Sequence, residues 1–139
     1  MLIRTYENEK DLDAVLELWA TAGDGIQLSR SDTPEEILKK LKRDPDLFLV
    51  AVENEKIVGV VLGGYDGRRG IIYHLAVRLA NRGAGIGKLL MSELEERLKA
   101  KGCLKYYLLV TQGNPDVLSF YESIGCEKMP HQLMGKEIL

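Results

Sequence analysis

Apolar residues along the chain alternate between strand-like and helix-like spacing. Residues 2–6 read as a short first strand. The next apolar side chains recur at helical spacing and define one stripe, formed by Leu12, Val15, Leu16 and Trp19. Asn8 stands where it can cap this first helix. In the later run TPEE, Thr33 can cap a second helix, Pro34 suits its first position and Glu36 completes a capping box.

Three β-rich runs follow, at residues 47–53, 56–64 and 71–77. The two residues Asn54 and Glu55 separate the first two runs, and a second turn surrounds Asp66 and Gly67. Short polar turns between apolar runs are typical of hairpins. The three runs are therefore expected to form an antiparallel meander.

The second half of the chain predicts helix, strand, helix and a final extended segment. Helix 89–101 carries leucines on one face and stops at Gly102. A helical crossover to strand 104–110 favours a parallel neighbour. Residues 127–139 are expected to add one or two strands, whose exposed edges would suit a homodimer. The fold class is α/β, with a mixed, mainly antiparallel sheet flanked by helices.

Length, charge and cysteine content restrict the class of protein. The 139 residues, 45% of them apolar, are expected to form a single domain spanning residues 1–139. A net charge of −2 gives no global field for nucleic acid or for an anionic membrane. Residues 1–11 contain no export signal, so the cytoplasm is the expected location. Cys103 and Cys126 are too few for a metal site, and free buried thiols are expected.

A glycine-rich turn at residues 82–88, read as RGAGIGK, precedes the third helix. Such a turn presents unpaired amides and the positive end of the helix dipole, which together receive phosphate. A Walker loop does not fit, because Arg82 replaces its first glycine and Leu89 its hydroxyl. A dinucleotide fingerprint fits poorly, because Lys88 stands at its third glycine and no acidic ribose ligand follows the next strand.

Two motifs resemble the GNAT superfamily of N-acetyltransferases. RxxGxG follows a strand ending in LAV, and NPDVLSFYESIG is similar to the second signature, an asparagine followed by a helix with a tyrosine. The resemblance covers about residues 71–125. It implies a GNAT-type fold, acetyl-CoA as cosubstrate, and direct acetyl transfer to a primary amine of a small molecule or a protein in a ternary complex. It implies no metal.

The resemblance also assigns roles to residues of this sequence. The cofactor would contact the backbone of Leu75, Ala76 and Val77, the pyrophosphate loop and Asn114. The loop residues are Arg82, Gly83, Ala84, Gly85, Ile86, Gly87 and Lys88. Asn114 is also a good helix cap before Pro115. Tyr121 would be the general acid that protonates the departing thiolate, whereas helical spacing alone favours an ordinary core tyrosine.

The general base is not obvious. Many relatives place a glutamate where this sequence has Ile71 and Leu109. His74, which alternates onto the same strand face as Ile72 and Ala76, is the candidate, because an unperturbed imidazole titrates near neutrality. A lone strand histidine also fits a structural role. Tyr73 and Glu122 are weaker candidates.

The acceptor is expected at the loop between the first two helices. Its polar residues are Asp24, Gln27, Ser29, Arg30 and Asp32. The aspartates suit an ammonium and Arg30 a carboxylate, although a solvated loop has the same composition. Two other functions stay open. One is a non-catalytic acyl-CoA-binding regulatory module, and the other is a nucleotide-binding regulatory domain.

Overall fold

Five strands form one sheet whose spatial order follows the chain in the computed structural model, which describes residues 1–23, 26, 28–111 and 113–139. The strands are β1 (Leu2–Thr5), β2 (Phe48–Glu53), β3 (Lys56–Tyr65), β4 (Gly70–Val77) and β5 (Tyr106–Leu108). The first four pair antiparallel with their neighbours, and β5 runs parallel to β4. The predicted meander and parallel crossover are confirmed.

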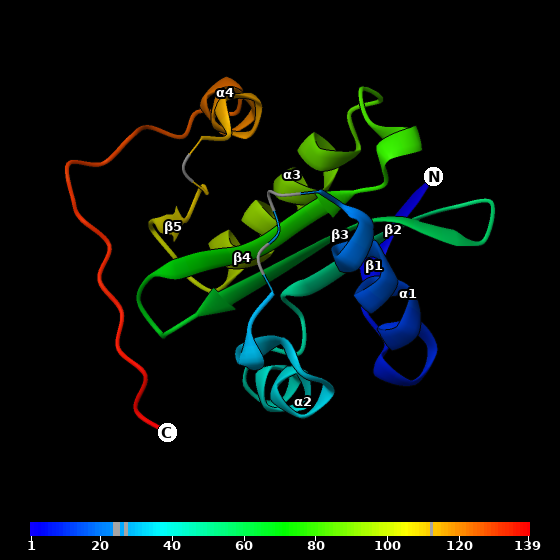
Figure 1. The fold of residues 1–139 in the computed structure, drawn as a ribbon, viewed down its shortest axis with the longest axis horizontal. Coiled ribbons are helices and arrows are strands. Elements are labelled where there is room, and N and C mark those ends of the chain that lie inside the picture. The colour runs from blue at the N-terminus through cyan, green and yellow to red at the C-terminus, as the bar shows by residue number, and fades with distance from the viewer. Residues whose placement is uncertain (24–25, 27, 112) are drawn as a thin grey trace.

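Helices cover both faces of this sheet (Figure 1). They are α1 (Asn8–Thr21), α2 (Pro34–Arg43), α3 (Ile86–Ala100) and α4 (Pro115–Ser123), with single 3-10 turns at η1 (Arg30–Asp32) and η2 (Leu79–Asn81). Side chains of α1 and α2, such as Trp19 and Ile37, pack with Phe48 in one core, called the α1 core. Leu94 of α3 and Tyr121 of α4 belong to a second core on the other face, called the α3 core.

The turn and cap signals are partly confirmed. Asn54 and Glu55 both have positive φ, 51° and 64°, the geometry of a two-residue hairpin. The Thr33 side chain accepts the amide of Glu36, as predicted, but the Glu36 carboxylate pairs with Lys39. The capping box forms one turn earlier, between Ser29 and Asp32.

The first helix begins differently from the prediction. Glu7, not Asn8, occupies the N-cap position of α1, and its side chain makes no capping hydrogen bond. The Asn8 side chain instead accepts a hydrogen bond from the Tyr6 hydroxyl at 2.8 Å. The backbone amide of Glu7 donates to the carboxylate of Asp11, a residue of the first turn, at 2.8 Å.

One predicted strand is shorter than expected, and the predicted strands of the C-terminal segment are wrong. β5 spans only Tyr106–Leu108 of the expected 104–110, because β4 and β5 pair through three residues and then part. Residues 127–139, all of which the structure describes, form no strand. This segment therefore does not pair with the outer edge of β5. Figure 1 shows this tail running from α4 back toward α2.

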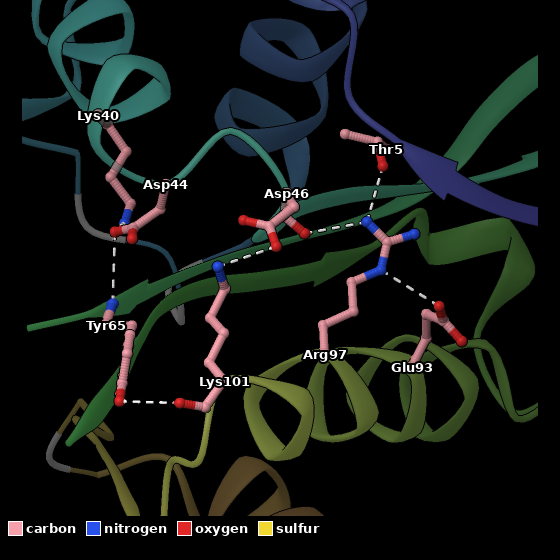
Figure 2. A network of polar contacts seen from close by, with 8 residues as sticks. All are labelled: Thr5, Lys40, Asp44, Asp46, Tyr65, Glu93, Arg97 and Lys101. Carbon is pink, nitrogen blue, oxygen red and sulfur yellow. Dashed lines mark hydrogen bonds and ion pairs between the residues drawn. The ribbon is translucent and has the colours of Figure 1, made fainter. Parts of the chain in front are cut away.

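A polar network fixes the end of α3 that lies away from the glycine turn (Figure 2). The Arg97 guanidinium donates to the Thr5 hydroxyl at 2.7 Å and to the Asp46 carbonyl at 2.9 Å. Lys101 pairs with the Asp46 carboxylate at 3.0 Å, and its carbonyl accepts the Tyr65 hydroxyl. These contacts tie α3 to the sheet, so the position of its N-terminus is set by the fold.

We expect Asp11→Ala to lower the free energy of unfolding by about 3–5 kcal/mol, since it leaves a partly buried guanidinium without its partner. Asp11 is 1% exposed, and Arg4 donates to both of its oxygens at 2.7 and 2.9 Å. Urea unfolding would measure this loss. Asp13→Ala, an exposed change on the same helix, should stay within about 0.5 kcal/mol of wild type; equal losses in both variants would contradict the assignment.

This pair also has a pH dependence. Burial opposes ionisation of Asp11, but the hydrogen bonds from Arg4 and the Glu7 amide prevail and lower its pKa. The Asp11 carboxyl therefore binds a proton less tightly in the folded state than in the unfolded state. The stabilisation of the fold by the Asp11–Arg4 pair is complete above the ordinary aspartate pKa. It is lost as the pH falls through the lower pKa of the folded state.

Candidate functional site

A β-bulge in β4 determines which way its side chains point. Ile72 pairs with Gly63 and His74 with Leu62, which leaves Tyr73 as an extra residue. Ile72 packs into the α3 core, whereas Ala76 packs into the α1 core and His74 contacts Trp19. The expectation that Ile72 shares a face with His74 is therefore wrong, because the extra residue reverses the alternation.

Beyond Ile72, β4 and β5 separate. The two strands pair only from Gly70 opposite Tyr106 to Ile72 opposite Leu108, while β4 continues to Val77. Leu75, Ala76 and Val77 thus have no strand partner on the β5 side within the described chain. An edge of this kind can hydrogen-bond to an extended ligand as an added strand would.

The turn before α3 exposes a row of backbone donors. No atom of the described residues accepts a hydrogen bond from the amides of residues 83–88. Gly83 and Gly85 have φ of 84° and 82°, a conformation that side chains other than glycine rarely adopt, and Gly85 is the N-cap of α3 with no side-chain cap. The turn is open to solvent except at Ile86 and Gly87. Free amides at a helix N-terminus form an anion site.

Other residues of the turn have structural contacts. Arg82 donates to the carbonyls of Val77, at 3.2 Å, and Ala22, at 2.6 Å, so it joins the turn to β4 and to the end of α1. A Cβ at Gly87 would lie 3.1 Å from the Phe120 ring, so this glycine lets α3 approach α4. Lys88 is exposed.

Asn114 and Tyr121 come from α4. Asn114 is the N-cap residue, as predicted, but its side chain makes no capping hydrogen bond. Tyr121 is 7% exposed and packs in the α3 core against Phe120, with ring centroids 5.2 Å apart. Burial, and secondarily the neighbouring Cys126 thiol, raises the pKa of Tyr121 to about 12. The phenol therefore carries its proton at neutral pH.

His74 has a carboxylate partner that sequence analysis did not find. Its Nε2 lies 2.8 Å from Oδ1 of Asp32, and both side chains are largely buried. Oδ2 of Asp32 accepts the Ser29 amide at 2.9 Å, and the Trp19 ring packs edge-on to the imidazole at 5.0 Å. The capping box of Ser29 and Asp32 was not predicted, and the contact of Asp32 with His74, 42 residues away, left no local signal.

This arrangement favours one tautomer of His74. A carboxylate accepts, so Nε2 carries the proton it donates to Asp32. The lone pair is then on Nδ1, which meets no hydrogen-bonding partner among the described residues. An imidazole oriented in this way can take up a proton at Nδ1 while the carboxylate stabilises the cation.

The remaining predicted residues are not gathered at one point. Tyr73 is 50% exposed on the His74 face, and Glu122 is exposed on α4. Arg30 pairs with Glu137 of the C-terminal tail. Asp24 and Gln27 lie outside the described residues. His74 and Tyr121 face opposite sides of the sheet.

Comparison with known proteins decides the family. The family model "Acetyltransferase (GNAT) family" matches residues 12–126. The chain belongs to the GNAT acetyltransferase family. An acetyltransferase of Pectobacterium atrosepticum is 42% identical over 139 residues, which cover 100% of this chain and 96% of that relative.

Solved structures share the GNAT fold. A PaiA N-acetyltransferase of Thermoplasma acidophilum, in complex with coenzyme A, has a TM-score of 0.81 at 22% identity, covering 94% of this chain and 92% of that one. Naa20 of Chaetomium thermophilum, in complex with a bisubstrate analogue, has a TM-score of 0.75 at 22% identity, covering 90% and 70%. The expected fold class and acetyltransferase family are confirmed.

Metal-binding clusters and membrane-spanning helices are both absent from the described part of this GNAT chain. No group of three or more His, Cys, Asp or Glu side chains there is placed to hold a metal ion. No described helix has both the length and the apolar composition needed to cross a membrane.

Proposed function

We propose that the protein transfers the acetyl group of acetyl-CoA to a primary amine by direct attack in a ternary complex. The observation that carries this proposal is the row of unpartnered amides at residues 83–88 beside the open edge of β4. The coenzyme A complex of the Thermoplasma relative supports the choice of cosubstrate.

The residues present fit such a ligand. A pyrophosphate needs several donors and a positive potential, and the glycine turn offers both without a side chain in the way. Leu75, Ala76 and the half-buried Asn114 would contact the pantetheine arm, whose amides match a strand edge. The Val77 carbonyl is already an acceptor for Arg82, so we expect Val77 to contribute packing and its amide.

His74 is proposed as the general base. Attack on the thioester carbon requires a neutral amine, and the proton lost from nitrogen would go to Nδ1 of His74, directly or through one water. Asp32 would hold the ring in the required tautomer and stabilise the imidazolium. Asp32 is thus a positioning residue in this scheme and not a ligand for the acceptor.

Tyr121 is proposed as the general acid. As the nitrogen–carbon bond forms, the carbon–sulfur bond breaks and the thiolate requires a proton. The raised pKa of Tyr121, about 12, keeps a proton available on its hydroxyl. The base would act on the amine and the acid on the sulfur, so two separate groups serve the two proton transfers.

The non-catalytic alternative is not favoured. It was suggested by the lack of a glutamate at Ile71 and Leu109, but the His74–Asp32 pair supplies an acceptor for the proton on the same sheet. A module that only binds has no need of an imidazole that a buried carboxylate orients.

The cosubstrate site is tested with Gly85→Leu. The side chain would cover the amides and strain a positive φ, so the Kd for acetyl-CoA should rise roughly 10- to 100-fold, the loss of one or two charge-assisted hydrogen bonds. Isothermal calorimetry measures this. Gly102→Leu is the matched control, since Gly102 has φ 83° and open space but lies beyond the other end of α3. Similar affinity in both variants would refute the loop as the pyrophosphate site.

A further inference from the structure

A basic groove of about 530 Å³ adjoins the candidate site on the α2 face of the sheet. Its walls come from α2, the β3–β4 turn, β4 and β5, and include the aromatic rings of Tyr73 and Tyr107. Tyr73 directly precedes His74, and the bulge turns both side chains to this face. The groove therefore continues from the proposed base along β4.

The charge of this groove is opposite to that of the whole protein. Four basic side chains line it, Lys40, Arg43, Arg68 and Arg69, against two acidic ones, Asp44 and Asp66. The complete chain carries −2. A positive surplus confined to one concave surface of an acidic protein indicates a ligand with negative charge.

Both acidic groups of the groove are already engaged. Lys40 pairs with Asp44, and one Asp66 oxygen accepts the amides of Arg68 and Arg69, each at 2.8 Å. These amide bonds, Arg69 before Arg68, lower the pKa of Asp66, so its contribution is to hold the turn that carries the two arginines.

The arginine side chains have no carboxylate of their own. Within the described residues, neither Arg68 nor Arg69 forms an ion pair, and the Arg43 guanidinium donates to the Tyr65 carbonyl. The Arg69 guanidinium lies 5.4 Å from the centre of the Tyr107 ring, which holds it over the groove. A planar guanidinium held in this way can bind a carboxylate or phosphate through two hydrogen bonds.

We infer that the acceptor amine carries an anionic oxygen group, a carboxylate or a phosphate, which Arg69 and Arg68 bind while the amine reaches His74. This inference rests on the proposed function and names the acceptor class. Tyr107 pairs with Ile71, two to three strand residues from the base, so amine and anion should be about 7–10 Å apart. That spacing excludes α-amino acids and suits ω-amino acids or short peptides.

The test compares acceptors that differ in charge, in anionic group or in length. Wild-type protein with acetyl-CoA is assayed with 6-aminohexanoate, its uncharged amide, 5-aminopentyl phosphate and glycine. We expect kcat/KM for the two long anions to exceed that for the amide roughly tenfold, the worth of one charge-assisted hydrogen bond, and glycine to be poor. The long anion with the higher kcat/KM shows whether the groove prefers a carboxylate or a phosphate.

Two variants test whether Arg69 causes the preference for anionic acceptors. Arg69→Gln should remove the tenfold preference by raising KM for the anion about tenfold. Lys42→Gln removes the same charge from an exposed site on α2 outside the groove, and the preference should persist. A preference that survives Arg69→Gln, or one lost equally in both variants, would overturn the inference.

A binding measurement separates this inference from the proposed function. 6-Acetamidohexanoate, the product, and its uncharged amide are titrated by calorimetry without any cosubstrate. Tighter binding of the anion, lost in Arg69→Gln, supports the groove even if no acetyl transfer occurs, which would count against the proposed function alone. Equal acetylation of acid and amide, or equal binding of their products, overturns the groove and leaves the proposed function standing.

Discussion

His74→Gln is expected to lower kcat about 10²–10⁴-fold, the range for a positioned general base. Glutamine keeps a polar side chain of similar size but has no nitrogen that accepts a proton. The KM for acetyl-CoA should be unchanged, because the glycine turn and the open edge of β4 are unaltered. Steady-state release of the thiol, measured with an amine acceptor, gives both constants.

Two further variants separate chemistry from folding. His131→Gln, at the exposed second histidine, should have wild-type activity. Asp32→Asn should reduce kcat roughly 10- to 100-fold, as for partners that orient a functional histidine, since an amide can present the wrong group to Nε2. Full activity of His74→Gln would remove this histidine from the mechanism.

Tyr121→Phe is expected to reduce kcat by a similar 10²–10⁴-fold with little change in the Kd for acetyl-CoA. The ring stays in the α3 core, so only the hydroxyl and its proton are lost. Because the pKa of Tyr121 is about 12, the wild-type rate should show no loss from tyrosine ionisation below about pH 10. Rate measurements from pH 7 to 10 at saturating substrates test this.

The control for this variant is Tyr6→Phe. Tyr6 is also buried, and burial likewise raises its pKa to about 12, but it lies in the α1 core and its hydroxyl donates to Asn8. Removing that hydroxyl should leave kcat unchanged. If the two variants retain equal activity, Tyr121 has no part in proton transfer.

Local signals predicted the fold well where sequence neighbours determine the conformation. Asn54 and Glu55 form the turn of a hairpin, Thr33 caps α2, and Gly102 ends α3, since each depends on contacts within a few residues. The glycine turn belongs to the same class. Its row of free amides could be predicted because they follow from local backbone geometry.

Features that depend on distant contacts could not be predicted. The bulge at Tyr73 comes from the register between β3 and β4, and it reversed the expected position of Ile72. Asp32 reaches His74 only after the sheet and α1 are assembled. Arg82 was expected to be a charged side chain beside the turn. Its guanidinium instead donates hydrogen bonds to a carbonyl of β4 and to one at the end of α1. The length of β5 depends on where its neighbour departs, which no local pattern encodes.

Backbone amide NMR during titration with acetyl-CoA tests the central claim most directly. The account predicts that the largest shifts fall on residues 83–88, whose amides would gain acceptors, with a second set on residues 75–77 of the open β4 edge. Saturable shifts confined to other parts of the chain, or none at all, would contradict it.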